Sequence, residues 1–373
     1  MLSNRISFSD EQGMLLETAV AFCREKSPIR AVRDLLPSTT GFNPTIWDEM
    51  TALGWSGIAI PEHHGGSGLT LAEAATIAEP MGRHLLATPY ASTQIALHAL
   101  LAGANAAQQA ALLPRIAQGT IATTAVFESD GDWDLTRIAA TATRSGATAR
   151  LDGHKSLVAD AAVAGLILAS VLLDGAPALA ILDTAGLPPG RLRPETIIDE
   201  TRRSAGLDLT GIEIPATALI TGPPALAALA AIRNAALLLA TAEAAGGIAG
   251  VLDLTVDYLN TRTAFGRKIG SYQSLKHTCA DILVGLERTR SHLYHAATLC
   301  ASNEPAEIAL RMAKAEATDV FAHAGDRAVQ FHGGFGFTWD CDAQLYLRRA
   351  LWLQYSFGDA AHHRRKLADL LLG

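Results

Sequence analysis

The sequence predicts a mostly helical α+β protein in three parts, because the residue pattern changes twice along the chain. Apolar residues recur at helical spacing over residues 9–119, and short runs with strand propensity fill residues 120–222. Helical periodicity then returns and lasts to the C-terminus. We therefore expect an N-terminal helical domain at 1–119, a central antiparallel β-domain at 120–222 and a C-terminal helical bundle at 223–373.

The N-terminal part is expected to begin with a helix for which Ser9 and Gln12 form a capping box. Apolar residues follow at helical spacing: Met14, Leu15, Ala19 and Phe22. A second amphipathic stretch begins at Trp47, and the glycine cluster at 65–68 then indicates a loop.

The central part contains runs with strand propensity at 122–127, 141–151, 165–173 and 178–182. Turns rich in glycine, proline and aspartate separate these runs, which is typical of an antiparallel β-domain.

The C-terminal part opens with Pro223 and Pro224, a pattern that favours the first turn of a helix. Helical segments are expected at 225–261, around 275–293 and at 306–331. Small side chains, mostly alanine, allow such helices to pack closely.

Composition and charge argue against several classes of function. The net charge of −7 comes without a basic stripe, so we expect no nucleic-acid partner. The four cysteines lack CxxC spacing, which favours reduced, mostly buried thiols over disulfides or a metal site. No secretion signal is visible, and the longest uncharged apolar run, 161–173, is too short to cross a bilayer. We therefore expect a cytoplasmic protein with no membrane partner.

Two segments are candidates for ligand binding. Arg262 lies where a long helix gives way to a loop, and its planar fork of donors suits a diphosphate. A charge that stabilises the helix C-terminus is the alternative. Residues 330–338, QFHGGFGFT, carry three glycines in four positions, which indicates backbone close to a ligand or to another helix. An ordinary turn accounts for these glycines equally well.

Two histidine pairs, His63 with His64 and His362 with His363, could suggest a metal site. Adjacent residues cannot easily aim both rings at one metal, and no cysteine or carboxylate cluster accompanies either pair. We therefore expect solvated histidines on a loop or a helix surface.

Three segments in this order and spacing resemble the acyl-CoA dehydrogenase family, and the resemblance covers nearly the whole chain. Residues 53–68, LGWSGIAIPEHHGGSG, match one family motif near the N-terminus. Residues 258–273, YLNTRTAFGRKIGSYQ, match a second motif, and residues 330–338 match a third. The resemblance implies an N-terminal helical domain, a central β-domain and a C-terminal four-helix bundle.

The resemblance also implies FAD bound between the β-domain and the bundle. In relatives, the residues that match Arg262, Phe265 and Gln273 hold the FAD of a neighbouring subunit. The turn that matches Gln330, Gly333 and Gly334 packs on the pyrophosphate and adenosine of that cofactor. Such a site needs at least a dimer, and members of the family are usually tetramers.

The reaction implied is the α,β-dehydrogenation of an acyl-CoA thioester. A carboxylate removes the α-proton while hydride leaves the β-carbon for the flavin, and an electron-transfer flavoprotein then reoxidises the flavin. In this sequence, both usual positions of that carboxylate hold other residues, Phe357 and Ala236. Neither side chain can accept a proton.

Glu243 and Asp359 are the residues that could replace the base. Glu243 lies seven residues after Ala236 on the same helix face, an offset of about 10 Å at ~1.5 Å per residue. Asp359 lies two residues after Phe357. The alternatives are a buried carboxylate bonded within the bundle for Glu243 and a structural hydrogen bond for Asp359.

The flavin-binding stretches of the β-domain also depart from the family pattern. Residues 125–131, AVFESDG, replace the usual flavin loop. In residues 155–159, KSLVA, Leu157 and Ala159 stand where a tryptophan and a threonine usually touch the ring.

Residues 201–203 and 357–359 resemble a bacterial, steroid-degrading branch, in which two paralogous subunits form a heterotetramer and one of them lacks the base. We therefore expect a subunit that works with a paralogue on a bulky or steroid-derived acyl-CoA. A self-sufficient dehydrogenase with a relocated base and a non-catalytic subunit that completes its partner's FAD site are the alternatives. A homo-oligomer remains open as the form of assembly.

Overall fold

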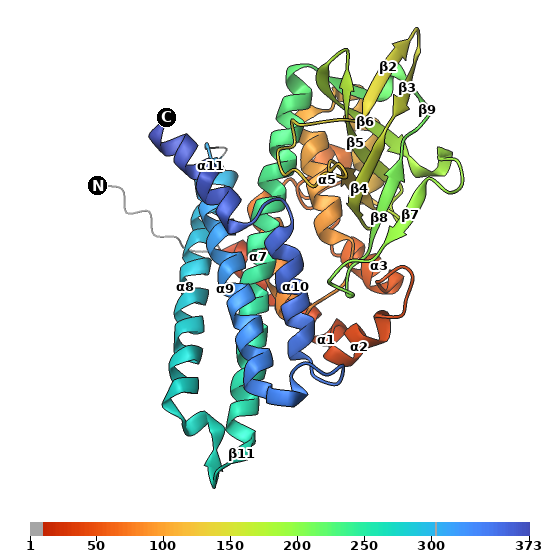
Figure 1. Cartoon of the computed structure of the whole chain (residues 1–373). Coiled ribbons are helices and arrows are strands. Elements are labelled where there is room, and N and C mark those ends of the chain that lie inside the picture. Colours follow the sequence, from red (N-terminus) through yellow and green to blue (C-terminus); the bar gives the residue numbers. More distant parts are fainter. Residues whose placement is uncertain (1–9, 303) are drawn as a thin grey trace.

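The computed structural model describes residues 10–302 and 304–373, and in these residues a group of helices precedes the first strand (Figure 1). The helices are α1 (Asp10–Lys26), α2 (Ile29–Leu35), α3 (Pro44–Ala52), α4 (Leu71–Arg83), α5 (Tyr90–Gly103) and α6 (Ala106–Ala117). Capping boxes begin α4, with Thr70 and Glu73, and α6, with Asn105 and Gln108. The capping box expected at Ser9 lies outside the described residues.

The β-domain is built from two sheets. Its strands are β1 (Ala122–Ala125), β2 (Thr141–Ser145), β3 (Thr148–Asp152), β4 (His154–Ala159), β5 (Leu166–Leu173), β6 (Ala176–Asp183), β7 (Leu192–Glu195), β8 (Ser204–Asp208), β9 (Ile212–Pro215) and β10 (Leu219–Thr221). The larger sheet has the order β10-β6-β5-β2-β3-β9, with β1 also paired to β5, and the smaller has the order β4-β8-β7.

The larger sheet is mixed rather than wholly antiparallel. Strands β1 and β2 both run parallel to β5, and they pair with its first and last residues respectively. The remaining pairings of the two sheets are antiparallel. The parallel pairs arise because the loop between β1 and β2 carries the chain forward along the same side of β5, so the two strands share one direction.

Strand β5 separates two hydrophobic cores, because alternate residues of a strand point to opposite faces. Leu166 and Leu168 pack into the core shared with the helices, whereas Ile167, Ala169 and Val171 pack inside the β-domain. The strand is therefore buried on both faces, which explains why it reads as a continuous apolar run.

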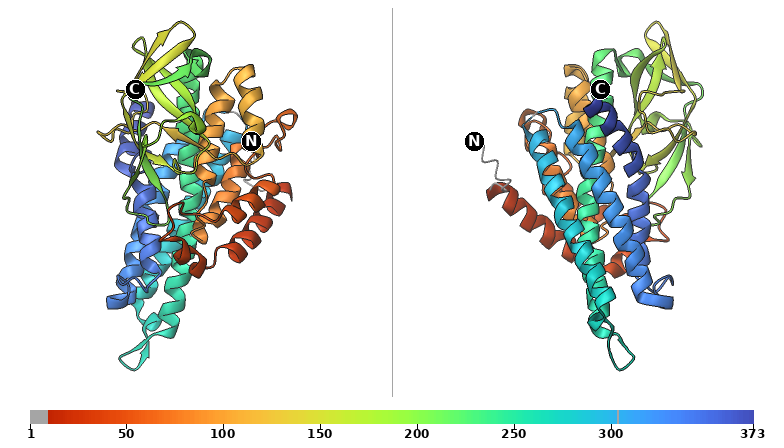
Figure 2. Two further views of the ribbon diagram at one scale, coloured as in Figure 1. Left: turned by 90° about the vertical axis from the view of Figure 1, so that its right-hand side faces the viewer. Right: turned by 60° about the vertical axis from the view of Figure 1, so that its left-hand side comes forward.

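The C-terminal part is a bundle of long helices with the β-domain against one end (Figures 1 and 2). Its helices are α7 (Pro223–Thr261), α8 (Gln273–Ala301), α9 (Glu307–His332), α10 (Ala343–Tyr355) and α11 (Ala360–Leu372). A two-stranded turn, β11 (Thr263–Ala264) and β12 (Arg267–Lys268), protrudes at the other end between α7 and α8 (Figure 1). Helix α7 contacts α8, α9 and α10 of the bundle and also α4 and α5 of the N-terminal part.

Glycines allow α4 and α7 to touch backbone to backbone. A Cβ on Gly82 would lie 1.9 Å from the carbonyl oxygen of Glu243, and one on Gly246 would lie 1.8 Å from that of Glu79. No larger residue fits at either crossing point. By length and composition α7 is apolar enough to cross a membrane, but 94% of its most apolar window is buried inside the protein. It is therefore the core helix of this fold.

Candidate functional site

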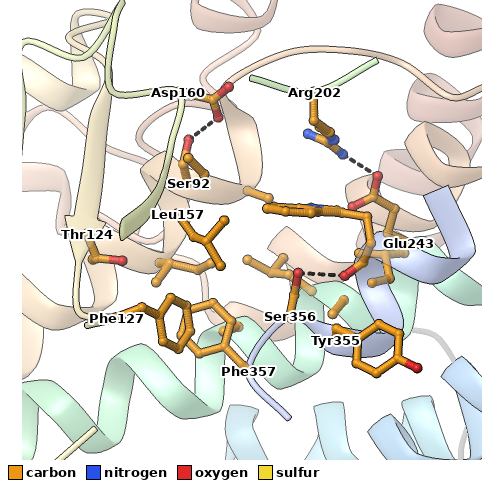
Figure 3. Close-up of a pocket in the computed structure, with 18 of the residues that line it drawn as sticks. Ser92, Thr124, Phe127, Leu157, Asp160, Arg202, Glu243, Tyr355, Ser356 and Phe357 are labelled. Carbon is orange, nitrogen blue, oxygen red and sulfur yellow. Dashed lines mark hydrogen bonds and ion pairs between the residues drawn. The ribbon is translucent and has the colours of Figure 1, made fainter. Parts of the chain in front are cut away.

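An apolar cavity of about 210 Å³ lies between the β-domain and the bundle (Figure 3). Its walls come from α5, the β1 and β4 strands, the middle of α7 and the end of α10. Most of the lining side chains are apolar, including Ile95, Leu157, Leu239, Leu351 and Phe357. A cavity of this kind between two domains is the usual place for a small-molecule site.

Both residues at the expected base positions lie in the wall of this cavity. Ala236 contributes from α7, and Phe357 follows the end of α10. The Phe357 ring packs edge-on against Phe127 of the β-domain, with ring centroids 4.8 Å apart. Phe357 has a left-handed backbone, with φ +57°, and the Lys314 ammonium donates to the next carbonyl, Gly358 O, at 2.8 Å. The aromatic side chain is therefore fixed at this position of the wall.

Glu243 reaches the cavity, but it is bonded to two arginines. Its carboxylate is buried and accepts hydrogen bonds from the guanidinium groups of Arg202 and Arg349. Arg349 is itself fully buried and also pairs with Asp199. The structure thus shows a buried ionic network around Glu243, with two guanidinium groups on the same carboxylate oxygen.

Asp359 lies outside the lining of this cavity. It is the N-cap residue of α11, and its side chain accepts a hydrogen bond from the backbone N–H of His362 at 2.7 Å. The structure therefore brings only one of the two carboxylates that the sequence suggested into the cavity wall.

Asp160 is a cavity residue that the sequence analysis did not single out. It follows directly after β4, has φ +54°, and accepts a hydrogen bond from the Ser92 hydroxyl at 2.6 Å. Burial raises the pKa of its carboxyl, and this rise is opposed by the nearby Arg202 guanidinium and supported by Glu243. Its place next to the KSLVA stretch is the signal that could have identified it.

The flavin-loop segment of the β-domain carries an internal ion pair. Lys155 is buried, and its ammonium pairs with the Glu128 carboxylate and donates to the Ser170 hydroxyl at 2.9 Å. The same carboxylate accepts from the backbone N–H of Ala139 at 3.0 Å. Glu128 is therefore engaged within the β-domain, while Leu157, with φ +53°, lines the cavity.

The second group of candidate residues lies near the protruding turn of the bundle. Arg262 is the exposed C-cap residue of α7, Phe265 is 96% exposed, and Gln273 begins α8. Gln330 is exposed near the end of α9, and a Cβ built on Gly333 or Gly334 would meet no atom within 4 Å. The Tyr258 and His332 rings stack at 4.2 Å between centroids, so the two motifs meet at this end of the bundle.

These two regions are far apart within one chain. Arg262 follows Glu243, the last α7 residue in the cavity wall, by 19 residues, which at ~1.5 Å per residue places it about 28 Å from the cavity. No arginine side chain bridges that distance, so the Arg262 region of a chain cannot complete the cavity of the same chain.

A second cavity, of about 450 Å³, adjoins the first, since Trp133 and Phe357 line both. Its wall contains the cations Arg233, Arg311 and Lys366. Glu307 pairs with Arg233 at 2.9 Å and with Arg311 at 2.7 Å, so part of this charge is offset.

The histidine pairs differ from the expectation of solvated side chains in one residue. His363 is buried, with its Nδ1 3.3 Å from the Arg311 guanidinium, because α11 packs this side chain against α9. His362 is half-buried beside Trp133. His63 and His64 lie on an exposed or half-exposed turn.

Comparison with known families assigns both helical parts of the chain. Residues 9–120 match the family described as acyl-CoA dehydrogenase, N-terminal domain, and residues 227–372 match acyl-CoA dehydrogenase, C-terminal domain. The chain is 30% identical over 343 residues to acyl-CoA dehydrogenase IpdE2 of Mycolicibacterium smegmatis, which covers 92% of this chain and 93% of that protein.

Two solved structures have the same fold. A variant of the Tcur3481-Tcur3483 steroid ACAD superposes with a TM-score of 0.88 at 27% identity, covering 97% of this chain and 98% of that one. The ChsE4-ChsE5 complex from Mycobacterium tuberculosis gives a TM-score of 0.90 at 23% identity, with 98% of each chain covered.

Proposed function

Because this chain belongs to the acyl-CoA dehydrogenase family, whose members are oxidoreductases acting on CH–CH groups, we propose that it is the base-free subunit of a two-subunit dehydrogenase. In this proposal a paralogous subunit supplies the catalytic carboxylate. The substrate is a bulky, steroid-derived acyl-CoA, an assignment supported by the similarity to a protein described as a steroid ACAD. An electron-transfer flavoprotein in the cytoplasm would accept the electrons.

The observation that carries the proposal is the composition of the cavity wall. Phe357 and Ala236 occupy the base positions, and the carboxylates that line the cavity are Glu243 and Asp160. Glu243 is bonded to two guanidinium groups, and Asp160 accepts the Ser92 hydroxyl. Both carboxylates are therefore engaged in hydrogen bonds within this chain, which supports a base supplied by another subunit.

FAD is the cofactor of this family, and bound FAD accepts the hydride that leaves the substrate. The exposed Arg262 guanidinium and the open backbone at Gly333 and Gly334 fit a diphosphate, which needs a fork of donors and close backbone approach. In the chain's own cavity Phe127 and Phe357 pack against each other, and Leu157 and Ala159 stand at the positions whose residues usually touch the ring, which supports a ring bound elsewhere. We infer that Arg262 serves an FAD whose ring lies in the partner subunit.

The separation of about 28 Å between Arg262 and the cavity, at ~1.5 Å per residue of α7, supports this arrangement, since the arginine can act only on a site in another chain. The residues placed at that end are Arg262, Phe265, Gln273, Gln330, Gly333 and Gly334.

The two adjoining cavities suit the two halves of an acyl-CoA. The apolar cavity matches an acyl group, and the second cavity, whose three cations Arg233, Arg311 and Lys366 are balanced by Asp134, Glu307 and Asp369, matches a polar portion of CoA. Phe357 stands where the two cavities meet.

The proposal is tested by expressing the chain alone and together with a glutamate-bearing paralogue, and measuring acyl-CoA-dependent reduction of an artificial electron acceptor. We expect turnover only for the co-expressed pair, and loss of that turnover when the paralogue's glutamate is changed to glutamine. Steady turnover by the chain alone would overturn the proposal.

A self-sufficient enzyme with a relocated base is the second candidate, and Asp160 is the observation that favours it. Its pKa is raised by burial, as a proton acceptor for a weakly acidic α-carbon requires. If this candidate holds, the chain alone turns over and Asp160→Asn removes that activity while the protein stays folded.

A further inference from the structure

The inner end of the apolar cavity is polar, in contrast to the rest of its wall. Ser92 from α5, Asp160 after β4, Arg202 before β8 and Glu243 from α7 meet there (Figure 3). Phe127 and Phe357 lie away from this cluster in the same view. A mostly apolar cavity with a small set of convergent polar groups recognises a ligand that is hydrocarbon along its length and polar at one place.

Arg202 has N–H groups that are not used within the described part of the protein and could bond such a ligand. Its side chain is 11% exposed, one Nη donates to the carbonyl oxygen of Thr88 at 3.3 Å, and the other pairs with Glu243. A guanidinium carries five N–H groups, and within the described part of the chain these two contacts leave Nε–H and one N–H on each terminal nitrogen. Because Arg202 lines the cavity, these donors can bond an oxygen of the ligand.

The charges of the cluster decide whether the bound oxygen is neutral or anionic. The guanidinium groups of Arg202, Arg203 and Arg349 face the carboxylates of Asp160, Asp199 and Glu243, so the formal charges cancel. Arg203 donates its hydrogen bonds to backbone carbonyls, including those of Ser38 and Glu200. An anionic ligand would leave an uncompensated buried charge, whereas a neutral oxygen gains a charge-assisted hydrogen bond at no such cost.

We propose that the inner end of this cavity binds a neutral carbonyl or hydroxyl oxygen carried on the alicyclic part of an acyl group, with Arg202 as its donor. The inference rests on the proposed function, because it takes the cavity as the acyl pocket. Apolar residues such as Ile95 and Leu239 contact the hydrocarbon, and Ser92 with Asp160 flanks the oxygen. In this base-free chain the interaction is measured as binding rather than as turnover.

The test is calorimetric titration of the full-length chain with matched CoA thioesters. The probes are cyclohexanepropionyl-CoA, its 4-oxo derivative and its 4-carboxy derivative. We expect the 4-oxo thioester to bind about 10-fold more tightly than the unsubstituted one, since the extra contact is a hydrogen bond to a charged donor. The 4-carboxy thioester is expected to bind more weakly than the 4-oxo compound.

Two variants assign the preference to Arg202. Arg202→Met is expected to bring the affinities for the 4-oxo and unsubstituted thioesters within about two-fold of each other. Arg202→Lys keeps a positive charge opposite Glu243 if the methionine variant fails to fold, and it is expected to reduce the preference at least about three-fold because the fork of donors is lost. Arg115→Met, which removes a half-exposed arginine paired with Asp183 outside the cavity, is the matched control and should keep the full preference.

The outcomes separate this inference from the proposed function. Equal affinity of the native chain for the 4-oxo and unsubstituted thioesters overturns the oxygen site alone, and so does a preference that survives both Arg202 variants. Tighter binding of the 4-carboxy than of the 4-oxo thioester overturns the inference that the bound oxygen is neutral. Failure of all three thioesters to bind overturns the cavity as an acyl pocket, whereas the base-free role itself is decided by the turnover of the co-expressed pair.

Discussion

The Phe127 and Phe357 rings meet edge to face, with centroids 4.8 Å apart and an angle of 63° between their planes. One ring comes from the β-domain and the other from the turn between α10 and α11. Edge-to-face pairs at this distance are favourable beyond the area they bury, so the contact ties the two halves of the cavity together.

Loss of the Phe357 ring should therefore destabilise the fold. We expect Phe357→Ala to lower the free energy of unfolding by about 2 kcal/mol, less than for a fully buried phenylalanine because this side chain is only partly buried. Phe337, which is 76% exposed, is the control, and Phe337→Ala should change the free energy by less than about 0.5 kcal/mol. Urea unfolding of the isolated chain measures both, and equal effects would contradict a structural role for the ring pair.

Arg262→Leu should remove flavin from the assembled protein. The substitution deletes a planar, charged donor that is exposed at the C-cap of α7, and we expect FAD occupancy to fall at least about 10-fold. Arg288→Leu removes an arginine on the surface of α8 and should leave the occupancy unchanged. Occupancy is read from flavin absorbance per protein, with circular dichroism to check folding. Full flavin content in a folded Arg262→Leu protein would remove this residue from the FAD site.

The chain should associate into a dimer or a tetramer. Helices α7 and α8 expose Val256, Leu283 and Val284, whose exposed fractions are 36%, 49% and 57%. Apolar side chains exposed on the long bundle helices favour burial against another subunit. Light scattering at micromolar concentration should give a multiple of the chain mass, and Leu283→Glu with Val284→Glu should reduce it. Leu372→Glu, at a residue 85% exposed near the C-terminus, is the control. A monodisperse monomer for the native chain would contradict this prediction.

Stability should rise with pH between about 7 and 9 because of Lys314. Burial lowers the pKa of this ammonium to about 7, although Asp359 and Asp319 oppose the change. The folded chain is then neutral at this residue where the unfolded chain still carries a proton, so the unfolded state binds more protons and stability increases with pH. The expected increase from this residue is about 2 kcal/mol over the interval.

The variant Lys314→Met should abolish that increase, while Lys276→Met, at an exposed residue of α8, should not. The free energy of unfolding, measured with urea at pH 7 and at pH 9, gives the pH dependence of stability for the native chain and for each variant. Identical pH dependence in the native chain and in Lys314→Met would show that the buried lysine does not titrate in this range.

The fold could be predicted from the sequence because its main signals are local. The double proline at the start of α7 and the end of α9 at His332 were both visible as short patterns. The parallel pairing of β1 and β2 with β5 was not, because register and direction depend on contacts between distant residues. Strands with few aromatic or polar markers, such as β8, also gave no clear pattern.

The candidate site was predictable only where a motif fixed a residue. The family resemblance singled out Phe357 and Ala236, which both line the cavity, but it could not show that Phe127 would meet Phe357. It also missed Asp160, since a lone aspartate after a strand is usually a turn residue. The partners of Glu243, Arg202 and Arg349, lie 41 and 106 residues away, and no local pattern links them.

The last prediction separates structural from catalytic roles for the carboxylates near the usual base positions. Glu243 is bonded to Arg202 and Arg349 inside the protein, so Glu243→Gln should destabilise the fold by about 3 kcal/mol, as expected when one member of a buried ionic network is removed. Asp359 caps α11 through the N–H of His362, so Asp359→Ala should cost about 1 kcal/mol, whereas Asp359→Asn, another good cap, should cost little. The isolated, FAD-supplemented chain should show no reduction of an artificial acceptor with straight-chain or branched acyl-CoA, before or after any of these changes. Turnover by the native chain that disappears in a folded Glu243→Gln or Asp359→Asn protein would instead identify that carboxylate as the relocated base.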